Sequence, residues 1–363
     1  MKKIVWITAD SFIDVDLPIV EVVSKDCNIT WIVILGKLTV VDYYELIERQ
    51  TKLRPTYFKL KYRGRDIRLA FQYFKLLNNI RKQNPDIVYV DCVGAPYFVP
   101  MLRLFLGNSK VVFAVHNVKT PKGAHNYYFM RSYVNLAMIL FRNVHVFSRS
   151  QFNYLKNRWG KKNVLEAPLA LKDFGASKVK DKNKLITFLN FGIIRDYKRV
   201  DILIEAAELA YERTRTPFLV IIAGSCNNWS KYQNLIKNKF LFETRIEPIP
   251  NSDIPDLFAK SHYFVLPYQD IAQSGALTVA LNYNLPVLAS DLPAFLDVIE
   301  NGVNGYIFEA GSVFALADLI EEIILNHENT YQVLLTNQQE YVATNYNVEQ
   351  IARKYIDCFK SLV

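Results

Sequence analysis

The chain has 363 residues, of which 51% are hydrophobic and 22% charged, and its formal net charge is +9. This length suffices for about two domains, and so high a hydrophobic fraction excludes a disordered chain. No apolar run approaches the roughly 20 residues that span a bilayer, so the sequence does not predict an integral membrane protein.

Short apolar segments alternate with helical ones in the first half of the chain. β-branched, almost continuously apolar segments are typical of parallel strands buried on both faces, and they occur at 3–9, 29–35, 86–91, 110–116 and 144–148. Apolar residues recur every three to four positions within 66–83, which predicts a helix. Further helices are predicted near 95–106 and 126–141.

The second half repeats this alternation. Strands are predicted at 185–191, 218–224, 263–268 and 286–290, with helices near 199–213, 230–239, 254–260, 274–284, 294–300 and 312–326. A hairpin-like turn is expected at Gly302 and Gly305, and the polar stretch 172–184 is the predicted join. The predicted fold class is therefore α/β, with two Rossmann-like domains facing each other across a cleft.

Charge is distributed unevenly between the halves. Residues 1–180 hold 29 Lys and Arg against 13 Asp and Glu, whereas residues 181–363 hold 15 against 22. In the densest basic stretch, 48–82, aromatic residues are interleaved with cations, and Glu48 and Asp66 are the only acids. The cations are Arg49, Lys52, Arg54, Lys59, Lys61, Arg63, Arg65, Arg68, Lys75, Arg81 and Lys82.

Three interpretations of this basic stretch are open: an anionic membrane surface, a nucleic acid, or an ordinary solvated face. A basic residue near anionic lipid gains about 1 kcal/mol, so several together would give useful peripheral binding. No helix-turn-helix, zinc-finger or RNA-binding motif accompanies the charge, and we therefore expect no nucleic acid partner.

Other sequence features argue for a cytoplasmic protein without a cofactor. Three acidic residues follow the first apolar segment too early for a secretory signal. The cysteines have neither metal-ligand spacing nor histidine neighbours, so we expect free thiols at Cys27, Cys92, Cys226 and Cys358. No GxGxxG turn follows either first strand, which argues against a dehydrogenase. Asp14 and Asp16 match the DxD motif that binds metals in other proteins. Chance or helix capping explains so short a match better, and no metal is expected.

Two cations follow the first strand of the second half. After the turn at Gly192, Arg195 and Lys198 lie in the strand-to-helix loop, at the carboxyl end of a predicted parallel strand. Open α/β sheets bind ligands at this edge, and paired cations beside a helix N-terminus suit a diphosphate. The alternative is two ordinary surface cations.

A second candidate site segment is Gln273-Ser274-Gly275, at the start of the predicted helix 274–284. Small residues here let an anion approach the free N–H groups of the first helical turn, and a side chain at Gly275 would crowd that approach. Helix capping by Ser274 is the structural alternative and is compatible with ligand binding.

Three motifs of the second half together resemble a known family. They are F-G-x-I-R-x-Y-K-x-x-D-x-L-I-E-A, the L-P-Y…S-G…P-V-x-A-S-D block, and D-V-I-E-N-G-x-N-G-x-I-F, and they cover roughly residues 185–330. In this order they resemble the donor domain of the family-4 glycosyltransferases, retaining enzymes of the GT-B fold that use nucleotide sugars. Residues 346–362 are similar to the family's final helix, which crosses back to the first domain. The resemblance thus implies an acceptor domain at 1–172 with 346–363, and a donor domain at 183–345.

The resemblance also implies roles for individual residues. Arg195 and Lys198 would neutralise the donor diphosphate, and the backbone N–H groups of Ser274 and Gly275 would bind the distal phosphate. Asp297 stands where the family's helix carries a Glu, and the strand 111–117 resembles the family's strand that ends in a His, here His116.

One departure from the family pattern concerns its E-x7-E carboxylates. Their positions here are Ile271 and Val279, so both carboxylates are missing, and Asp270 or Gln273 could reach the donor sugar instead. Subfamilies with a Q-S-G signature resemble this chain in that loss.

These features predict a glycosyltransferase that moves a sugar from a UDP- or GDP-sugar to a saccharide acceptor. A lipid-linked acceptor in bacterial-type surface polysaccharide synthesis, at the inner face of the membrane, suits the basic first half. Retention without a metal is expected, with the leaving phosphate taking the acceptor's proton. An inverting enzyme would need a base instead, for which Asp14, Asp16 and His116 are candidates. A catalytically idle nucleotide-sugar-binding relative and a GT-B-fold epimerase are the alternatives.

Overall fold

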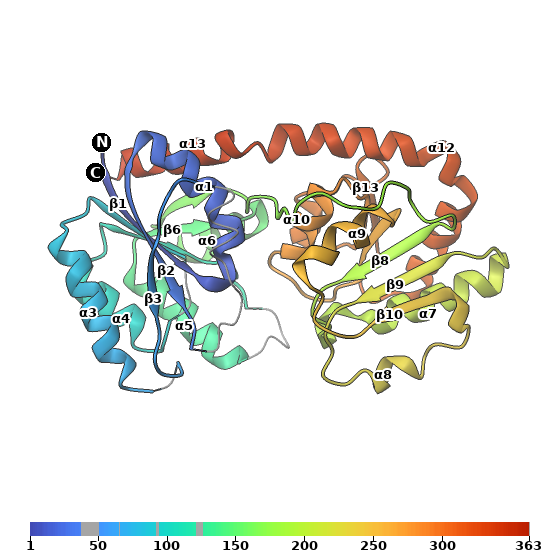
Figure 1. Ribbon diagram of the computed structural model, residues 1–363, viewed down its shortest axis with the longest axis horizontal. Helices are drawn as coiled ribbons and strands as arrows, with labels where there is room; N and C mark the ends of the chain where they lie inside the picture. Colours follow the sequence, from blue (N-terminus) through green and yellow to red (C-terminus); the bar gives the residue numbers. More distant parts are fainter. Residues whose placement is uncertain (38–50, 65, 92–93, 121–125, 363) are drawn as a thin grey trace. The chain divides into compact units, whose positions relative to one another are not determined.

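The computed structural model describes residues 1–37, 51–64, 66–91, 94–120 and 126–362. The chain divides into two compact units (Figure 1). The first contains the described residues 1–120, 126–170 and 346–362, and the second contains residues 171–345.

The first unit is built on a parallel sheet of seven strands in the order β3-β2-β1-β4-β5-β6-β7. The strands are β1 (Lys3–Ala9), β2 (Asn28–Leu35), β3 (Thr56–Lys59), β4 (Ile87–Asp91), β5 (Val111–Ala114), β6 (Asn143–Val146) and β7 (Asn163–Glu166). Chain order runs outward from β1 to β3 and then returns to β4 on the other side of β1. The winding therefore reverses between β1 and β4, and sheets of this topology bind ligands at the carboxyl ends of the strands at such a point.

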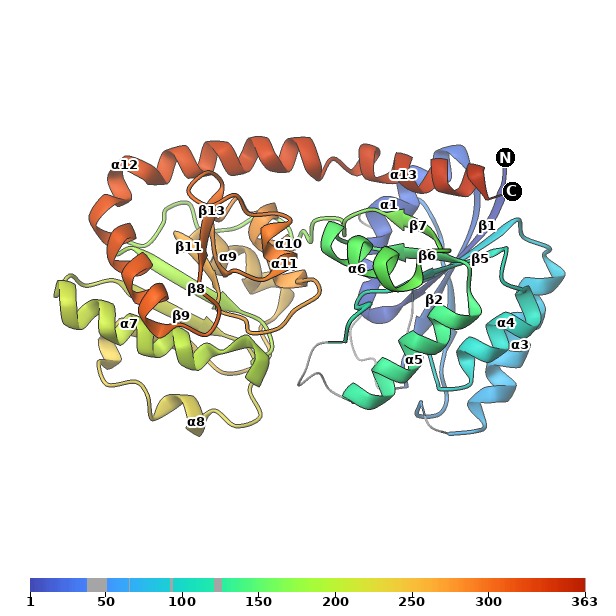
Figure 2. The ribbon, with the colours of Figure 1, turned by 180° about the vertical axis from the view of Figure 1, so that it is seen from behind.

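Helices cover both faces of this sheet (Figure 2). They are α1 (Ile13–Asp26), α3 (Leu69–Lys82), α4 (Phe98–Leu106), α5 (Tyr127–Leu140), α6 (Arg149–Trp159) and α13 (Val348–Ser361). α3, α4 and α5 bury their apolar sides in one core, whereas α1 and α13 contribute to the core on the opposite face.

Helix α13 belongs to the first unit although it ends the chain. Its Tyr355 ring stacks on Trp6 of β1 with 5.5 Å between ring centroids. Lys2 Nζ donates hydrogen bonds to the carbonyl oxygens of Phe359 and Lys360 at 2.8 and 3.0 Å. The two ends of the chain are therefore held together within one core.

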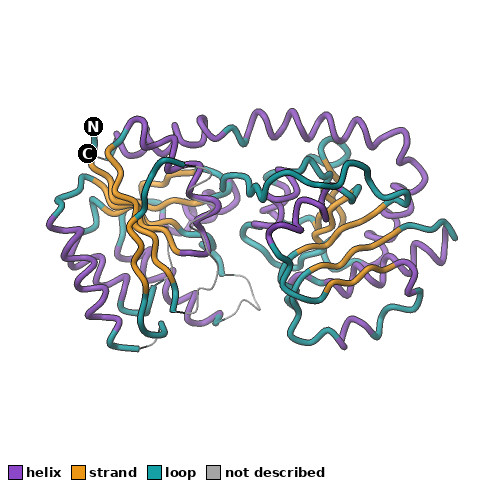
Figure 3. The backbone as a smooth tube through the Cα atoms, in the orientation of Figure 1, coloured by secondary structure: helices purple, strands orange, loops and turns teal. Residues whose placement is uncertain are grey.

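The second unit has a parallel sheet of six strands in the order β10-β9-β8-β11-β12-β13 (Figure 3). The strands are β8 (Thr187–Phe191), β9 (Leu219–Ala223), β10 (Phe242–Arg245), β11 (Tyr263–Leu266), β12 (Val287–Ser290) and β13 (Gly305–Phe308). The helices are α7 (Val200–Thr214), α8 (Ser230–Gln233), α9 (Ile254–Ala259), α10 (Gly275–Asn282), α11 (Pro293–Leu296) and α12 (Val313–Asn345). Here the winding reverses between β8 and β11.

Some sequence predictions of local structure are wrong. The turn at Gly302 and Gly305 is not a hairpin, because β13 begins at Gly305 and pairs in parallel with β12. A Cβ atom at Gly305 would lie 2.6 Å from the Val287 carbonyl oxygen, so only glycine permits this strand to pair there. The helix predicted over 230–239 ends at Gln233, and the helix predicted over 312–326 continues to Asn345.

None of the helices in the described parts of the chain combines the length and apolar character needed to cross a bilayer. Cys27, Cys226 and Cys358 are free thiols, and Cys92 lies outside the described residues.

Candidate functional site

Two glycines that lie close together follow the neighbouring strands β8 and β9. Gly192 has φ +108° and Gly224, after β9, has φ +146°, and both values favour glycine. Gly192 N donates to the Ala223 carbonyl oxygen at 2.9 Å. A Cβ atom at Gly224 would overlap the Gly192 carbonyl, so the two strand ends approach as closely as backbone allows.

Lys198 folds back over this glycine turn. Its Nζ would lie 3.2 Å from a Cβ atom placed on Gly192, and it lies 5.4 Å from the centroid of the Tyr268 ring. Burial lowers the pKa of the Lys198 ammonium, and the nearby Arg195 guanidinium lowers it further. Lys198 is thus partly desolvated, and the exposed Arg195 lies near it.

Two cations near Lys198 and Arg195 form ion pairs with carboxylates, whereas Lys198 and Arg195 form none within the described residues. Arg199 forms an ion pair with Asp201 at 2.9 Å, and Lys231 forms one with Asp196 at 3.0 Å. Within the described residues, no carboxylate pairs with Arg195 or Lys198. A half-buried cation without a carboxylate is a site that an anion can stabilise.

Helix α10 begins where the sequence predicted. Ser274 is its N-cap, and Ser274 Oγ accepts a hydrogen bond from Leu277 N at 3.2 Å. Gly275 is the first helical residue, so the opening turn carries no side chain at this position. Capping by Ser274 and an open first turn therefore coexist in this structure.

Tyr268 joins the two parts of the site. It follows β11 and is almost fully buried, and its carbonyl oxygen accepts a 2.6 Å hydrogen bond from Ser290 Oγ. Burial raises the pKa of the Tyr268 phenol, against a smaller opposing effect of its hydrogen bond with Ser274. Its ring contacts the Lys198 ammonium and its hydroxyl contacts the N-cap of α10, which fixes the two loops to one another.

Lys172 is a site residue that the sequence analysis missed. A Cβ atom at Gly275 would lie 3.4 Å from Lys172 Cε and 3.8 Å from its Nζ. The Lys172 side chain therefore lies beside the first helical residue of α10. In the sequence, the only feature that singles out Lys172 is its position in the polar stretch 172–184 between the two predicted domains.

The remaining predicted donor residues occupy the same edge of the sheet. Asp270 and Gln273 are half-buried in the loop between β11 and α10, and Asp297 follows the short helix α11. Val279, at the second position of the missing carboxylate pair, is buried within α10, and Ile271 is half-buried in the loop.

In the first unit, the structure places His116 beside a carboxylate that the sequence analysis overlooked. His116 Nε2 lies 2.6 Å from Oδ1 of Asp91, the last residue of β4. The imidazole is stacked between Phe12 and Phe147, with ring centroids 3.9 and 4.4 Å away. This fixed ring lies at the carboxyl ends of the central strands.

Asp16 is part of the core of the first unit. Its Oδ2 accepts hydrogen bonds from Trp6 Nε1 at 3.0 Å and from Thr8 Oγ1 at 2.7 Å. Burial raises the pKa of Asp16 well above its usual range, and the adjacent carboxylate of Asp91 raises it further. The candidate base Asp16 is therefore a buried anchor rather than a group open to an acceptor, whereas Asp14 is half-buried.

Metal binding finds no support among the described side chains. No group of three or more His, Cys, Asp or Glu in the described ranges is placed to hold an ion. Asp16 is turned into the core, so the DxD sequence match does not form a joint carboxylate site with Asp14.

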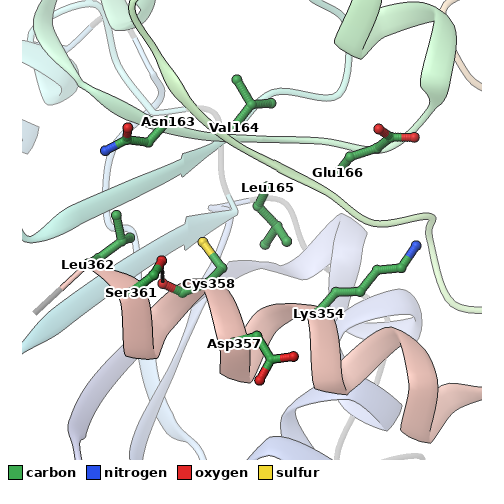
Figure 4. Close-up of a pocket in the computed structure, with 9 residues that line it drawn as sticks. All are labelled: Asn163, Val164, Leu165, Glu166, Lys354, Asp357, Cys358, Ser361 and Leu362. Carbon is green, nitrogen blue, oxygen red and sulfur yellow. Dashed lines mark hydrogen bonds between the residues drawn. The ribbon is translucent and has the colours of Figure 1, made fainter.

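A separate pocket of about 470 Å³ lies between β7 and α13 (Figure 4). It is lined by Asn163, Val164, Leu165, Glu166, Lys354, Asp357, Cys358, Ser361 and Leu362. Its charges are of mixed sign, and burial raises the pKa of the Cys358 thiol to about 11. None of the predicted site residues lines this pocket.

Comparison with known proteins agrees with this architecture. Residues 172–341 match the model of the family described as glycosyl transferases group 1. The chain is similar to the structure of Anabaena Alr3699/HepE in complex with UDP and glucose, with 16% identity, a TM-score of 0.74, and coverage of 99% of this chain and 100% of that one. No curated protein sequence matches the chain.

Two further solved structures have the same fold. A glycosyltransferase from Rickettsia africae gives 15% identity and a TM-score of 0.72 over 99% of this chain and 98% of that chain. Sucrose-phosphate synthase from Thermosynechococcus elongatus gives 14% identity and a TM-score of 0.71 over 100% and 99%. The predicted GT-B fold is confirmed, and most of the second unit matches the group 1 glycosyltransferase model. This match supports the predicted transferase activity.

Proposed function

We propose that this protein transfers a sugar from a nucleoside diphosphate sugar, UDP-linked in the first instance, to a saccharide acceptor. The observation that carries the proposal is the pair of cations without carboxylate partners, Arg195 and Lys198, linked through Tyr268 to the open first turn of α10. Cations and bare amides are the groups that bind a diphosphate. The HepE structure, of the same fold, holds UDP, which supports uridine as the base.

The site acts mainly by electrostatic stabilisation of the leaving diphosphate. The bond between the anomeric carbon and the β-phosphate oxygen breaks, and the electron pair leaves with the diphosphate. Arg195, Lys198 and the N–H groups of α10 stabilise the growing negative charge. Since these groups neutralise the leaving group, we propose that the reaction requires no metal.

We further propose that the sugar keeps its anomeric configuration. Neither position of the family's carboxylate pair carries a carboxylate, and Val279 is buried, so no nucleophile is evident at those positions. In a front-face reaction, the leaving phosphate oxygen accepts the proton of the acceptor hydroxyl, and that hydroxyl oxygen bonds to the anomeric carbon on the same face.

The acceptor is proposed to be a lipid-linked saccharide at the cytoplasmic face of a membrane, in surface polysaccharide assembly. The excess of Lys and Arg in residues 1–180 supports this assignment. A catalytically idle binding protein is the second candidate, because Ile271 and Val279 replace the family's carboxylates.

Ligand-induced thermal stabilisation tests the donor assignment. A panel of UDP, GDP, ADP and their common sugars is expected to single out uridine nucleotides, and a ligand at 100 times its Kd adds about 2.7 kcal/mol to the free energy of unfolding. No stabilisation by any nucleotide would refute the proposal. Stabilisation by UDP-sugars without UDP release, with or without acceptors, would instead assign the idle binding role.

A further inference from the structure

Helices α3 and α4 pack against one another (Figures 1 and 2), and large apolar side chains on both helices and just before α3 are exposed to solvent. The exposed fractions are 71% for Ile67, 74% for Phe71, 50% for Phe74 and 80% for Leu104. The Phe74 ring meets Phe105 of α4 edge-on, with 5.3 Å between ring centroids. We call this surface, with its flanking Lys75, Lys82 and Arg103, the α3–α4 face.

The pattern of α3 shows that this exposure is systematic. One side of the helix is buried in the core, through Leu69, Tyr73, Leu76, Leu77 and Ile80. The opposite side of a surface helix is normally polar, but here it carries Phe71 and Phe74 together with Lys75 and Lys82, which lie three, four and eleven positions after Phe71. The helix therefore has two apolar sides, of which the fold uses one.

The cations of the α3–α4 face are not neutralised. Lys75, Lys82 and Arg103 are exposed, and no carboxylate within the described residues pairs with them. The sequence from 51 to 165 contains three acids, and all are engaged elsewhere. They are Asp66, paired with Arg68; Asp86, which accepts from Lys3 N; and Asp91, buried in the core.

We propose that the α3–α4 face docks the protein on an anionic lipid bilayer. Exposed Phe and Leu side chains insert at the boundary between headgroups and acyl chains, while Lys and Arg meet lipid phosphates from the same face. The apolar exposure and the positive charge are both explained by one partner that offers hydrocarbon and negative charge together. This inference rests on the proposed function, since it places the enzyme where a lipid-linked acceptor lies.

A nucleic acid fits this face less well. Aromatic rings stack on bases, but Ile67 and Leu104 offer bases neither stacking nor hydrogen bonds. Arg49, Arg65 and Glu48, which also belong to the predicted basic stretch, lie outside the described residues and carry no part of the argument.

Co-sedimentation with vesicles tests the proposal. The wild-type protein is expected to bind phosphatidylcholine vesicles that contain phosphatidylglycerol, to bind pure phosphatidylcholine far less, and to be released by salt. Replacing Lys75 and Lys82 together by Gln should weaken partitioning about 25-fold, at about five-fold for each basic residue. Replacing Phe71 and Phe74 together by Ser should weaken it at least about ten-fold.

The second unit offers a matched control. Lys239 and Phe240 are adjacent and exposed, with 58% of Phe240 accessible, and the double variant Lys239→Gln with Phe240→Ser should bind vesicles as the wild type does. The Lys75 and Lys82 variant should keep the wild-type melting temperature, because both side chains face solvent. The Phe71 and Phe74 variant loses the contact with Phe105 and the control variant loses the contact of Phe240 with Tyr211, so circular dichroism should show that both are folded at the assay temperature.

Several outcomes would overturn the docking proposal: no vesicle binding by the wild type, equal binding to neutral vesicles, or full binding by the α3–α4 variants. Binding of duplex DNA or RNA that is lost in the same variants, without vesicle binding, would assign the face to nucleic acid. Calorimetry with UDP separates this proposal from the donor proposal. Vesicle binding without UDP binding would refute the donor site alone, and UDP binding without vesicle binding would refute the docking face alone.

Discussion

His116 and Asp91 are joined by a contact of 2.6 Å between Nε2 and Oδ1, and Asp91 is fully buried. When the Asp91 carboxyl accepts this hydrogen bond, His116 Nε2 carries the N–H group that donates it. Asp91 thus fixes the tautomer of the histidine that the sequence marked as a candidate base.

Since the leaving phosphate is the proposed proton acceptor, replacing Asp91 by Asn should leave kcat within about ten-fold of the wild-type value, whereas a loss of about 10²-fold or more would identify His116 as a general base. Steady-state kinetics with the cognate acceptor measure the effect. UDP affinity should be unchanged, since Asp91 belongs to the first unit and the candidate diphosphate site to the second. An unchanged kcat would show that His116 has only a structural role.

The anomeric configuration of the product decides which group takes the acceptor's proton. We expect retention, observable by proton NMR of the first product formed, with the leaving phosphate as proton acceptor. Inversion would require a base on the opposite face of the sugar and would assign that role to His116 rather than to Asp16, which is buried.

Replacing Arg195 or Lys198 by Ala should each lower kcat/KM by about 10²–10³, the typical effect of losing one preorganised charge-stabilising group. Lys231→Ala is the matched control, because this exposed lysine is paired with Asp196 rather than left for a ligand. Its kcat/KM should stay near the wild-type value. A loss of equal size in all three variants would contradict a specific role of the two unpaired cations.

Alanine substitutions at Gly192 and Gly224 are expected to lower the free energy of unfolding by different amounts. Gly192→Ala should cost about 1–3 kcal/mol because of its positive φ, and should also weaken UDP binding by pushing against Lys198. Gly224→Ala should cost more, because its Cβ would overlap a carbonyl group that cannot rotate away. Gly64→Ala, with open space around it, should stay within about 0.5 kcal/mol of wild type in urea unfolding.

Two buried histidines predict a loss of stability in acid. Burial lowers the pKa of His145 to about 3 and that of His262 to about 4. Between pH 6.5 and these values the unfolded chain binds protons that the folded chain does not, so the free energy of unfolding falls as the pH falls. Each histidine contributes up to about 1.4 kcal/mol per pH unit.

The variant His262→Gln should show a shallower loss of stability between pH 6.5 and pH 4 than the wild type in urea unfolding. The control is the same comparison at pH 8, where both histidines are neutral and the difference between the two proteins should not depend on pH. Parallel stability curves below pH 6.5 would contradict the assignment.

The sequence allowed the centres of both sheets to be predicted, but not their edges. The four strands missed, β3, β7, β10 and β13, are the edge strands of the two sheets. An edge strand is paired on one side only and is here four residues long, so it lacks the continuous apolar run that marks a central strand. An edge strand is therefore recognised only from its pairing with the neighbouring strand in the structure.

The donor-side site was predictable in part for a similar reason. Arg195 and Ser274 follow central strands, and the carboxyl ends of neighbouring parallel strands meet at one edge whatever the details of packing. The contact of Lys172 with Gly275 joins residues about a hundred positions apart and follows no strand. The pairing of Asp91 with His116 depends on the register of β4 and β5, which no local pattern encodes.

The return of α13 to the first core imposes an order on biosynthesis. Trp6 is made before the second unit, whereas its stacking partner Tyr355 is made after the whole of that unit. The second unit can therefore complete its core during translation. During this time one apolar face of the first unit's sheet stays exposed, because α13 has not yet been made. Nascent chains arrested before α13 should be the species that chaperones recognise.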